Sequence, residues 1–296
     1  MPNAVEPPSE SPTRLEAAYA LLADTDGAPW RAIAGGTDLL VQVTGDIGEP
    51  PERVLDIWAL DELRGMSVEG GALVIGALTT YADLRRSPIV AEFVPALVEA
   101  AATIGAAQIQ NRATIGGNVM NASPAGDTLP VLLALGAEMI LGSVSGERAV
   151  VADDFWTGYR TTARRPDELL LRIRIPLLAG REMRFRKVGT RRAQSISKVV
   201  MALGWRDGRA GAAMRAATPW SGVRLALGSV AATPIRATAT EAGLEGRPPT
   251  PETADRAAET LAGELHPIDD VRSTAEYRRL VAARVLHRLI REAGGW

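Results

Sequence analysis

Two short stretches combine a glycine pair with polar side chains, a combination that suits the binding of an anion. Residues 34–42 read AGGTDLLVQ, and residues 114–127 read TIGGNVMNASPAGD. A glycine pair lets the backbone approach a ligand closely and adopt positive φ without steric cost. Successive N–H groups that converge form an anion-binding nest, which a helix N-terminus can reinforce. We interpret both stretches as anion cradles, and two cradles on one fold suit a dinucleotide with its pyrophosphate.

Polar side chains near each glycine pair would add donors and acceptors to the cradles. The first pair precedes Thr37, whose hydroxyl is an extra donor. The second is surrounded by Thr114, Asn118, Asn121 and Ser123. Neither stretch matches a P-loop, which needs a lysine after its second glycine, and neither matches the G-x-G-x-x-G pattern. The prediction therefore rests on the glycine pairs and not on an established nucleotide motif.

Simpler structural interpretations of the same residues stay open. A lone glycine pair most often forms a turn, which is how we interpret Gly70-Gly71. Asp127 stands where it could cap a following helix, and Lys187 could be a solvated charge on a strand. On these residues alone, dinucleotide binding and ordinary turns are equally supported.

Composition and charge narrow the classes of function. The 296 residues suggest roughly two domains, and 46% hydrophobic with 23% charged residues is typical of a soluble globular protein. The formal net charge of -2 favours neither nucleic acid nor an anionic membrane as a partner. No apolar run of about 18 residues occurs, so no transmembrane segment is expected. The N-terminal residues lack the regions of a signal peptide, and we expect a cytoplasmic location.

The chain contains no cysteine and only two histidines, His266 and His287. Cysteine-ligated iron–sulfur clusters, cysteine zinc sites, a thiol nucleophile and a cysteinyl flavin bond are therefore excluded within this chain. We expect no metal centre built by this chain alone. A catalytic triad that uses either histidine stays open, although no nucleophile-elbow motif accompanies them.

The elements that would position the glycine stretches follow from apolar periodicity and from glycine and proline punctuation. Residues 1–12 are proline-rich and acidic and are predicted to be a disordered tail. A helix is expected in 13–24, and a short buried strand in 30–36 ends at the first glycine pair, after which Thr37 or Asp38 can cap 39–43. The expected elements that follow are strands at 53–60 and 72–78, helices at 81–90 and 93–105, a short helix at 127–137 capped by Asp127 or Thr128, a hairpin at 138–152 and a strand at 169–176.

The second half predicts a small antiparallel sheet and a terminal amphipathic helix. Strand patterns cover residues 183–189, 196–205 and 222–230. From Tyr277 onward, apolar residues recur at helical spacing. The two rows are Val281, Val285 and Leu289, and Ala282, Leu286 and Ile290.

These segments together resemble the FAD-binding subunit of molybdenum hydroxylases, a family that includes the medium chain of carbon monoxide dehydrogenase and the FAD-binding part of xanthine dehydrogenase. The stretch at 34–42 is similar to the family's first FAD segment, and residues 108–138, QIQNRATIGGNVMNASPAGDTLPVLLALGAE, are similar to the second. The resemblance implies an α+β fold: a two-lobed FAD-binding domain of the PCMH or vanillyl-alcohol-oxidase type, then a small C-terminal domain of antiparallel sheet and helices. The implied domains are 13–178, with lobes at 13–65 and 66–178, and 179–296. The family's first strand falls on residues 4–12, AVEPPSESP, which make a poor strand.

The resemblance also implies a set of residues that bind FAD. One group would wrap the diphosphate: Ala32, Ile33, Ala34, Gly35, Gly36, Thr37, Asp38 and Leu39. A second would bind the diphosphate and ribityl region: Thr114, Ile115, Gly116, Gly117 and Asn118, with Ser123 beside them. Asp127 would hydrogen-bond the cofactor, Ile104 and Leu170 would lie against it, and Lys187 would lie near the flavin ring as a cation that favours the reduced form. FAD would be held without a covalent bond, and no catalytic residue is expected because the flavin carries the redox chemistry.

The function implied is that of an electron-transfer subunit in an oxidoreductase complex. Electrons would pass from iron–sulfur clusters through FAD to NAD, dioxygen or another acceptor. The implied partners are a molybdopterin-containing large subunit and a 2Fe-2S small subunit, assembled as a dimer of heterotrimers. Two alternatives stay open, namely a stand-alone FAD-dependent oxidase or reductase, and a non-redox nucleotide-binding assembly module.

Overall fold

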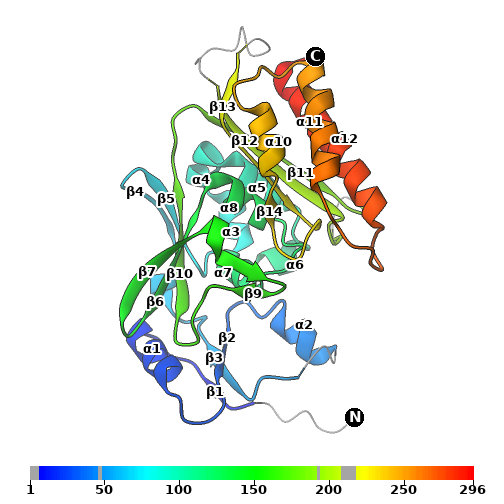
Figure 1. Cartoon of the computed structure of the whole chain (residues 1–296). Coiled ribbons are helices and arrows are strands. Elements are labelled where there is room, and N and C mark those ends of the chain that lie inside the picture. The colour runs from blue at the N-terminus through cyan, green and yellow to red at the C-terminus, as the bar shows by residue number, and fades with distance from the viewer. Residues whose placement is uncertain (1–6, 46–48, 192–193, 208–217) are drawn as a thin grey trace.

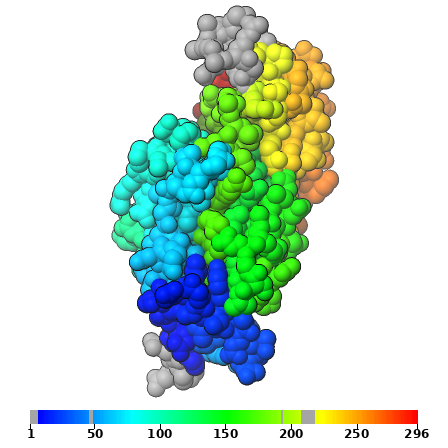
Figure 2. All heavy atoms as spheres, turned by 90° about the vertical axis from the view of Figure 1, so that its left-hand side faces the viewer, coloured from blue at the N-terminus to red at the C-terminus, as the bar shows by residue number. Residues whose placement is uncertain are grey.

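The computed structural model describes residues 7–45, 49–191, 194–207 and 218–296. The molecule is elongated, with the N-terminal lobe at one end, a central sheet with its helices in the middle, and a second sheet with three helices at the other end (Figure 1, Figure 2). Within the described ranges, no helix is long and apolar enough to cross a membrane.

The N-terminal lobe is a small parallel sheet with two α-helices. Its elements are β1 (Ser9–Glu10), α1 (Leu15–Ala23), β2 (Trp30–Ile33), α2 (Leu39–Thr44), β3 (Arg53–Asp56) and the short 3-10 helix η1 (Asp61–Leu63). The strands lie in the order β1-β3-β2. The predicted strand after α1 is therefore present, but the prediction that it is buried is wrong, because Arg31 and Ala32 are exposed.

The prediction of a disordered tail is wrong for the part that the structure describes. Ser9 and Glu10 pair in parallel with Val54 and Leu55 of β3, and the Val54 amide donates to the Pro8 carbonyl at 2.9 Å. The pairing uses backbone groups, and the side chains of Ser9 and Glu10 are exposed. The sequence therefore has no apolar residue that would indicate this strand. Residues 1–6 lie outside the described residues.

The central domain is a five-stranded antiparallel sheet in the order β4-β5-β10-β6-β7. The strands are β4 (Met66–Glu69), β5 (Ala72–Gly76), β6 (Glu138–Ser143), β7 (Gly146–Val151) and β10 (Leu169–Pro176). The predicted hairpin and the predicted strand at 169–176 are confirmed, and β4 was not foreseen. Gly70 and Gly71, at φ 55° and 74°, form the β4–β5 turn, a left-handed pair that glycine permits.

Helices pack beside this sheet and between the two domains. They are α3 (Tyr81–Arg86), α4 (Pro88–Phe93), α5 (Pro95–Ala102), α6 (Ala107–Gln110), α7 (Ile115–Asn121), α8 (Leu129–Leu135) and α9 (Ala152–Phe155), with a hairpin of β8 (Trp156–Gly158) and β9 (Thr161–Thr162) after them. The helix predicted at 81–90 is divided at Ser87, which ends α3 and caps α4 by accepting a hydrogen bond from the Val90 amide. Pro88 follows directly, which disfavours helical backbone at Ser87.

The C-terminal domain has the predicted antiparallel sheet, in the order β11-β12-β13-β14. Its elements are β11 (Arg181–Val188), β12 (Val199–Asp207), β13 (Trp220–Gly228), β14 (Ile235–Arg236), α10 (Thr238–Leu244), α11 (Pro251–Glu264) and α12 (Ala275–Gly294). One sheet face packs on α10, α11 and α12 through residues such as Leu203, Leu225 and Leu286. The terminal amphipathic helix is confirmed, with Ala282, Leu286, Leu289 and Ile290 buried.

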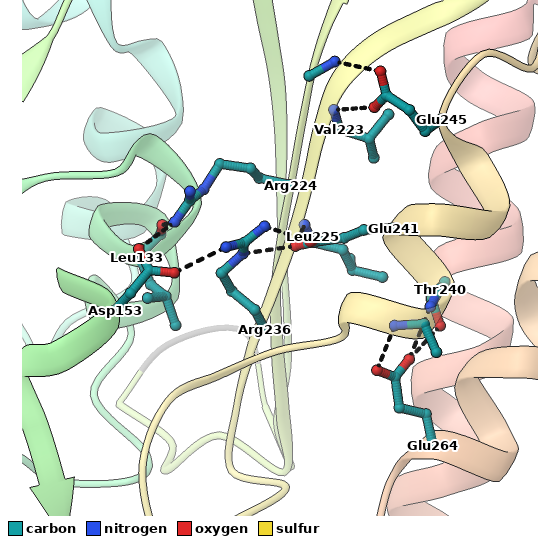
Figure 3. A network of polar contacts seen from close by, with 12 residues as sticks. Leu133, Asp153, Val223, Arg224, Leu225, Arg236, Thr240, Glu241, Glu245 and Glu264 are labelled. Atoms are coloured by element: carbon teal, nitrogen blue, oxygen red, sulfur yellow. Dashed lines mark hydrogen bonds and ion pairs between the residues drawn. The ribbon is translucent and has the colours of Figure 1, made fainter. Parts of the chain in front are cut away.

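The other face of this sheet continues the core of the central domain. Phe185, Val200, Ala202 and Ala226 belong to the same buried cluster as the residues of α5 and α8. Polar contacts reinforce the junction, since Asp153 of α9 accepts from Arg224 at 2.6 Å and from Arg236 at 2.9 Å (Figure 3). The two domains therefore share a continuous core.

Candidate cofactor site

A cavity of about 1670 Å³ opens between the N-terminal lobe, the central domain and the C-terminal domain. Pockets for drug-sized ligands commonly span about 300–1,000 Å³, so this one has room for an extended dinucleotide. All but one of the residues predicted for the site line it. Those that do are Ala32, Ile33, Ala34, Gly35, Gly36, Thr37, Asp38, Leu39, Ile104, Thr114, Gly116, Gly117, Asn118, Ser123, Asp127, Leu170 and Lys187.

The exception is Ile115, whose side chain is fully buried in the central core. Its backbone N–H donates to the Thr79 carbonyl at 3.0 Å. The prediction that Ile115 binds the ligand therefore does not fit the structure. Its place between a capping threonine and a glycine pair concealed that it packs inward as the first residue of α7.

The first glycine pair forms the loop between β2 and α2. A Cβ added to Gly35 would lie 1.8 Å from the Arg112 carbonyl oxygen, so only glycine allows this backbone approach. Gly36 has φ +76°, in the left-handed region. Within the described residues, the backbone N–H groups of residues 35–39 meet no acceptor in the chain. This run of free donors beside the cavity supports the predicted anion cradle.

The second glycine pair does not form the predicted cradle. The stretch begins a helix, α7, and the Thr114 hydroxyl caps it by accepting from the Gly117 amide at 3.0 Å. The Gly116 amide donates to the Ala77 carbonyl at 2.9 Å. These donors are therefore consumed inside the protein and are not available to a phosphate.

Gly116 is needed for packing and not for an unusual φ. A Cβ at this position would lie 2.6 Å from the Ala77 carbonyl oxygen, and its φ is not in the positive range. Gly117 has only the Thr114 hydroxyl near its place for a Cβ, at 3.0 Å. The second glycine pair thus lets α7 approach the end of β5 closely and places the start of α7 at the cavity wall.

Asn118 and Thr128 add polar groups to this wall. The Asn118 side-chain oxygen accepts from the Thr128 hydroxyl at 2.8 Å, and Thr128 also lies 3.2 Å from the Tyr81 hydroxyl. Burial raises the pKa of Tyr81, so this phenol stays neutral. The Asn118 amide nitrogen makes no hydrogen bond within the described part of the chain, and it is left for a ligand.

Asp127 and Lys187 form a buried ion pair in the cavity wall. Lys187 Nζ lies 2.5 Å from Asp127 Oδ2, with the side chains 9% and 6% exposed. The same ammonium donates to the Thr103 carbonyl at 3.2 Å, and the Thr103 hydroxyl donates to Asp127 Oδ2 at 3.1 Å. The alternatives of a helix-capping Asp127 and a solvated Lys187 are therefore wrong.

The other carboxylate oxygen of this pair has no partner. Asp127 Oδ1 is buried and accepts no hydrogen bond within the described residues. Burial raises the pKa of Asp127, and the Lys187 ammonium opposes that rise. A buried acceptor without a donor is costly, so the geometry fits a ligand that brings an N–H or O–H group to this position.

Several cavity residues were not foreseen from the sequence, and some of them lie in the C-terminal domain. Ser197, which is 1% exposed, donates to the Ala125 carbonyl at 3.2 Å and lies 2.8 Å from the Ser229 hydroxyl. Arg278 of α12 donates to the Ser229 carbonyl and to Asp270. These residues carry no local motif, and only the packing of the second sheet brings them to the cavity.

Comparison with known proteins agrees with this geometry. Residues 6–178 match the family described as FAD binding domain in molybdopterin dehydrogenase. Residues 184–293 match the CO dehydrogenase flavoprotein C-terminal domain. The carbon monoxide dehydrogenase medium chain of Hydrogenophaga pseudoflava is 32% identical over 285 residues, which cover 96% of this chain and 95% of the relative. The xanthine dehydrogenase FAD-binding subunit of Escherichia coli O157:H7 is 31% identical over 288 residues, which cover 95% of each.

Solved structures show the same likeness in three dimensions. The carbon monoxide dehydrogenase from Hydrogenophaga pseudoflava that lacks the Mo-pyranopterin moiety aligns with a TM-score of 0.89 at 32% identity, covering 98% of each chain. Quinoline 2-oxidoreductase from Pseudomonas putida 86 aligns with a TM-score of 0.88 at 28% identity, again covering 98% of each chain. The predicted fold class and the FAD cofactor are confirmed, and the chain belongs to the family of FAD-binding medium subunits of molybdenum hydroxylases.

Proposed function

We propose that this chain is the electron-transfer subunit of a molybdenum-dependent hydroxylase or dehydrogenase, holding FAD in the cavity between its lobes. The observation that carries the proposal is the joint presence, on one cavity, of the free amides of residues 35–39 and the unpartnered Asp127 oxygen. The first fits a pyrophosphate and the second fits a hydrogen-bond donor at another part of the same ligand.

The bound flavin supplies the redox chemistry, and the chain supplies binding and orientation. The amides of residues 35–39 hold negative charge without a basic side chain. Asp127 would accept a hydrogen bond from the cofactor through Oδ1, and Lys187 holds the same carboxylate through Oδ2. The nonpolar side chains of Ile104 and Leu170 exclude water from the cavity wall between them and the cofactor.

The partners follow from what this chain lacks and from the names of its relatives. The sequence has no cysteine, so iron–sulfur clusters that deliver electrons must be held by another chain. Relatives are named as medium chains or FAD-binding subunits. We propose a molybdopterin-containing large subunit and a 2Fe-2S small subunit, in a dimer of heterotrimers in the cytoplasm, with NAD, dioxygen or another molecule as acceptor.

The test is to purify the native chain with whatever accompanies it, and then the chain alone. Acid precipitation of the chain should release FAD into the supernatant, since the chain has no cysteine and both histidines lie outside the two FAD segments. Iron and molybdenum should accompany the complex and be absent from the isolated chain. The isolated chain should not oxidise purines, aldehydes or carbon monoxide, and adding the two partner subunits should restore flavin reduction by substrate. Turnover by the metal-free chain would favour a stand-alone oxidase, and a chain that never binds flavin would favour the non-redox module.

A further inference from the structure

Three hydrogen-bonded polar side chains at the edge of the cavity link the N-terminal lobe to the central domain. The Asn121 amide donates to Asp38 Oδ1 at 2.9 Å, and the Arg160 guanidinium donates to the Asn121 oxygen at 2.7 Å. The three residues are 83 and 39 positions apart in sequence, and all of them line the cavity. Asp38 belongs to the phosphate loop, Asn121 ends α7, and Arg160 lies in the β8–β9 turn. In Figure 1, α2 of the N-terminal lobe lies near α7 and β9 of the central domain.

The backbone at Arg160 indicates that its side chain is needed there. Arg160 has φ 53°, in the left-handed region, and it occupies a two-residue turn between the paired residues Gly158 and Thr161. Glycine or asparagine is the usual residue for such a turn position. An arginine held in this conformation is strained, and strain of this kind is typical of functional positions.

Apart from the hydrogen bond to Asn121, few contacts hold the far end of the phosphate loop, at Asp38, against the rest of the protein. None of the six residues of α2 is buried, and Leu40 and Val41 are 55% and 58% exposed. Gly35 anchors the near end of the loop against the Arg112 carbonyl. The far end, at Asp38, is tied to the central domain through Asn121.

The charges of Asp38 and Arg160 also support a link between the phosphate loop and the central domain. Asp38 places a carboxylate beside the amides that would hold a pyrophosphate, which would repel that anion. Partial desolvation raises the pKa of Asp38, which lies at the exposed surface, and the Arg160 guanidinium opposes that rise. The guanidinium therefore offsets the negative charge of Asp38 at the edge of the phosphate loop.

We propose that Asp38, Asn121 and Arg160 form a latch that holds the phosphate loop, residues 35–39, against α7 and thereby slows the release of FAD. The proposal rests on the assignment of the cofactor's phosphates to this loop. Asn121 and Arg160 are positioning residues in it, because they act on the loop and not on the flavin.

The experiment compares Arg160→Ala and Asn121→Ala with Arg165→Ala. Arg165 is an exposed arginine outside the cavity, so its variant matches the loss of charge but leaves the latch intact. FAD release is followed by the flavin fluorescence regained after dilution of the holoprotein. Each latch variant should release FAD about three- to tenfold faster, as expected for one net hydrogen bond. The double variant should release it no faster than either single one. Arg160→Lys, which keeps the charge and one donor, should restore part of the effect.

A second measurement needs no bound cofactor. The amides of Leu40 and Gln42 donate to the carbonyls of Gly36 and Asp38, so their hydrogen exchange in the FAD-free chain reports how well α2 and the loop are held. Exchange should accelerate in both latch variants and not in Arg165→Ala. Release rates equal to those of the Arg165 variant, or faster release with unchanged exchange, would overturn the latch. If the chain binds no FAD, accelerated exchange still supports the latch and unchanged exchange still refutes it.

Discussion

Replacing Lys187 with methionine removes one partner of the buried ion pair while nearly preserving side-chain volume. At the 2.5 Å separation of Lys187 Nζ and Asp127 Oδ2, the gross attraction is about 7 kcal/mol at an effective dielectric constant of about 20. Most of this is offset by the desolvation of both charges. The variant, however, leaves the Asp127 carboxylate buried without its cation. We therefore expect a loss of about 3–5 kcal/mol in the free energy of unfolding near neutral pH.

The loss should depend on pH, and its sign follows from Asp127. Burial already raises the pKa of this carboxyl, and the Lys187 ammonium limits the rise. Without the ammonium, the pKa in the folded state rises further above its unfolded value of about 3.9. A carboxyl whose folded pKa is raised favours folding at low pH and opposes it as pH rises through that pKa. The penalty should therefore be largest above neutral pH and shrink toward about pH 5.

Urea unfolding of the FAD-free chain, followed by circular dichroism at several pH values, measures this penalty. The matched control is the double variant Lys187→Met/Asp127→Asn, which replaces the stranded carboxylate with a neutral amide. It should regain at least half of the stability lost by the single variant. A single variant within about 0.5 kcal/mol of the parent, or one whose loss does not change with pH, would show that the pair is not a buried ion pair.

The remaining predictions concern other parts of the fold. Gly35→Ala should weaken FAD binding at least tenfold because its Cβ would lie 1.8 Å from the Arg112 carbonyl oxygen. Gly70→Ala, at φ +55° with no atom within 4 Å of its Cβ, should cost about 1 kcal/mol of stability and leave the affinity unchanged in the same fluorescence titration. Burial raises the pKa of Asp153, but its two arginine partners lower it by more. Its stabilisation should therefore be present above about pH 4 and fade as pH falls further, and Asp153→Asn should flatten this acid-side loss in unfolding experiments. Glu241→Ala should cost about 3 kcal/mol, seen as a lower Tm, because the 6% exposed carboxylate holds the Leu225 amide at 2.7 Å and the Arg236 guanidinium (Figure 3). An unchanged Tm would mean that water satisfies the Leu225 amide and the Arg236 guanidinium as well as the Glu241 carboxylate does.

The sequence by itself determined most elements and the location of the first glycine loop, residues 35–39. Apolar spacing alone predicted α12, with Leu286 and Ile290 buried, because helical periodicity is a local property. The strand at 169–176 was predicted in the same way from its alternation. The first glycine pair stays a predicted cradle, and the positive φ of Gly36 is a requirement that glycine meets locally.

Only the tertiary structure decided how the polar groups are used. The amides around Gly116 were predicted to be free, but the end of β5 and the Thr79 carbonyl consume them. Asp127 could have been a helix cap on the sequence alone, but its carboxylate pairs with the Lys187 ammonium, 60 residues away in sequence. The backbone of β3 orders Ser9 with no apolar side chain to signal it. Spacing in a sequence places a side chain on a face of its own element, but which distant donor or acceptor meets that face depends on how the elements pack.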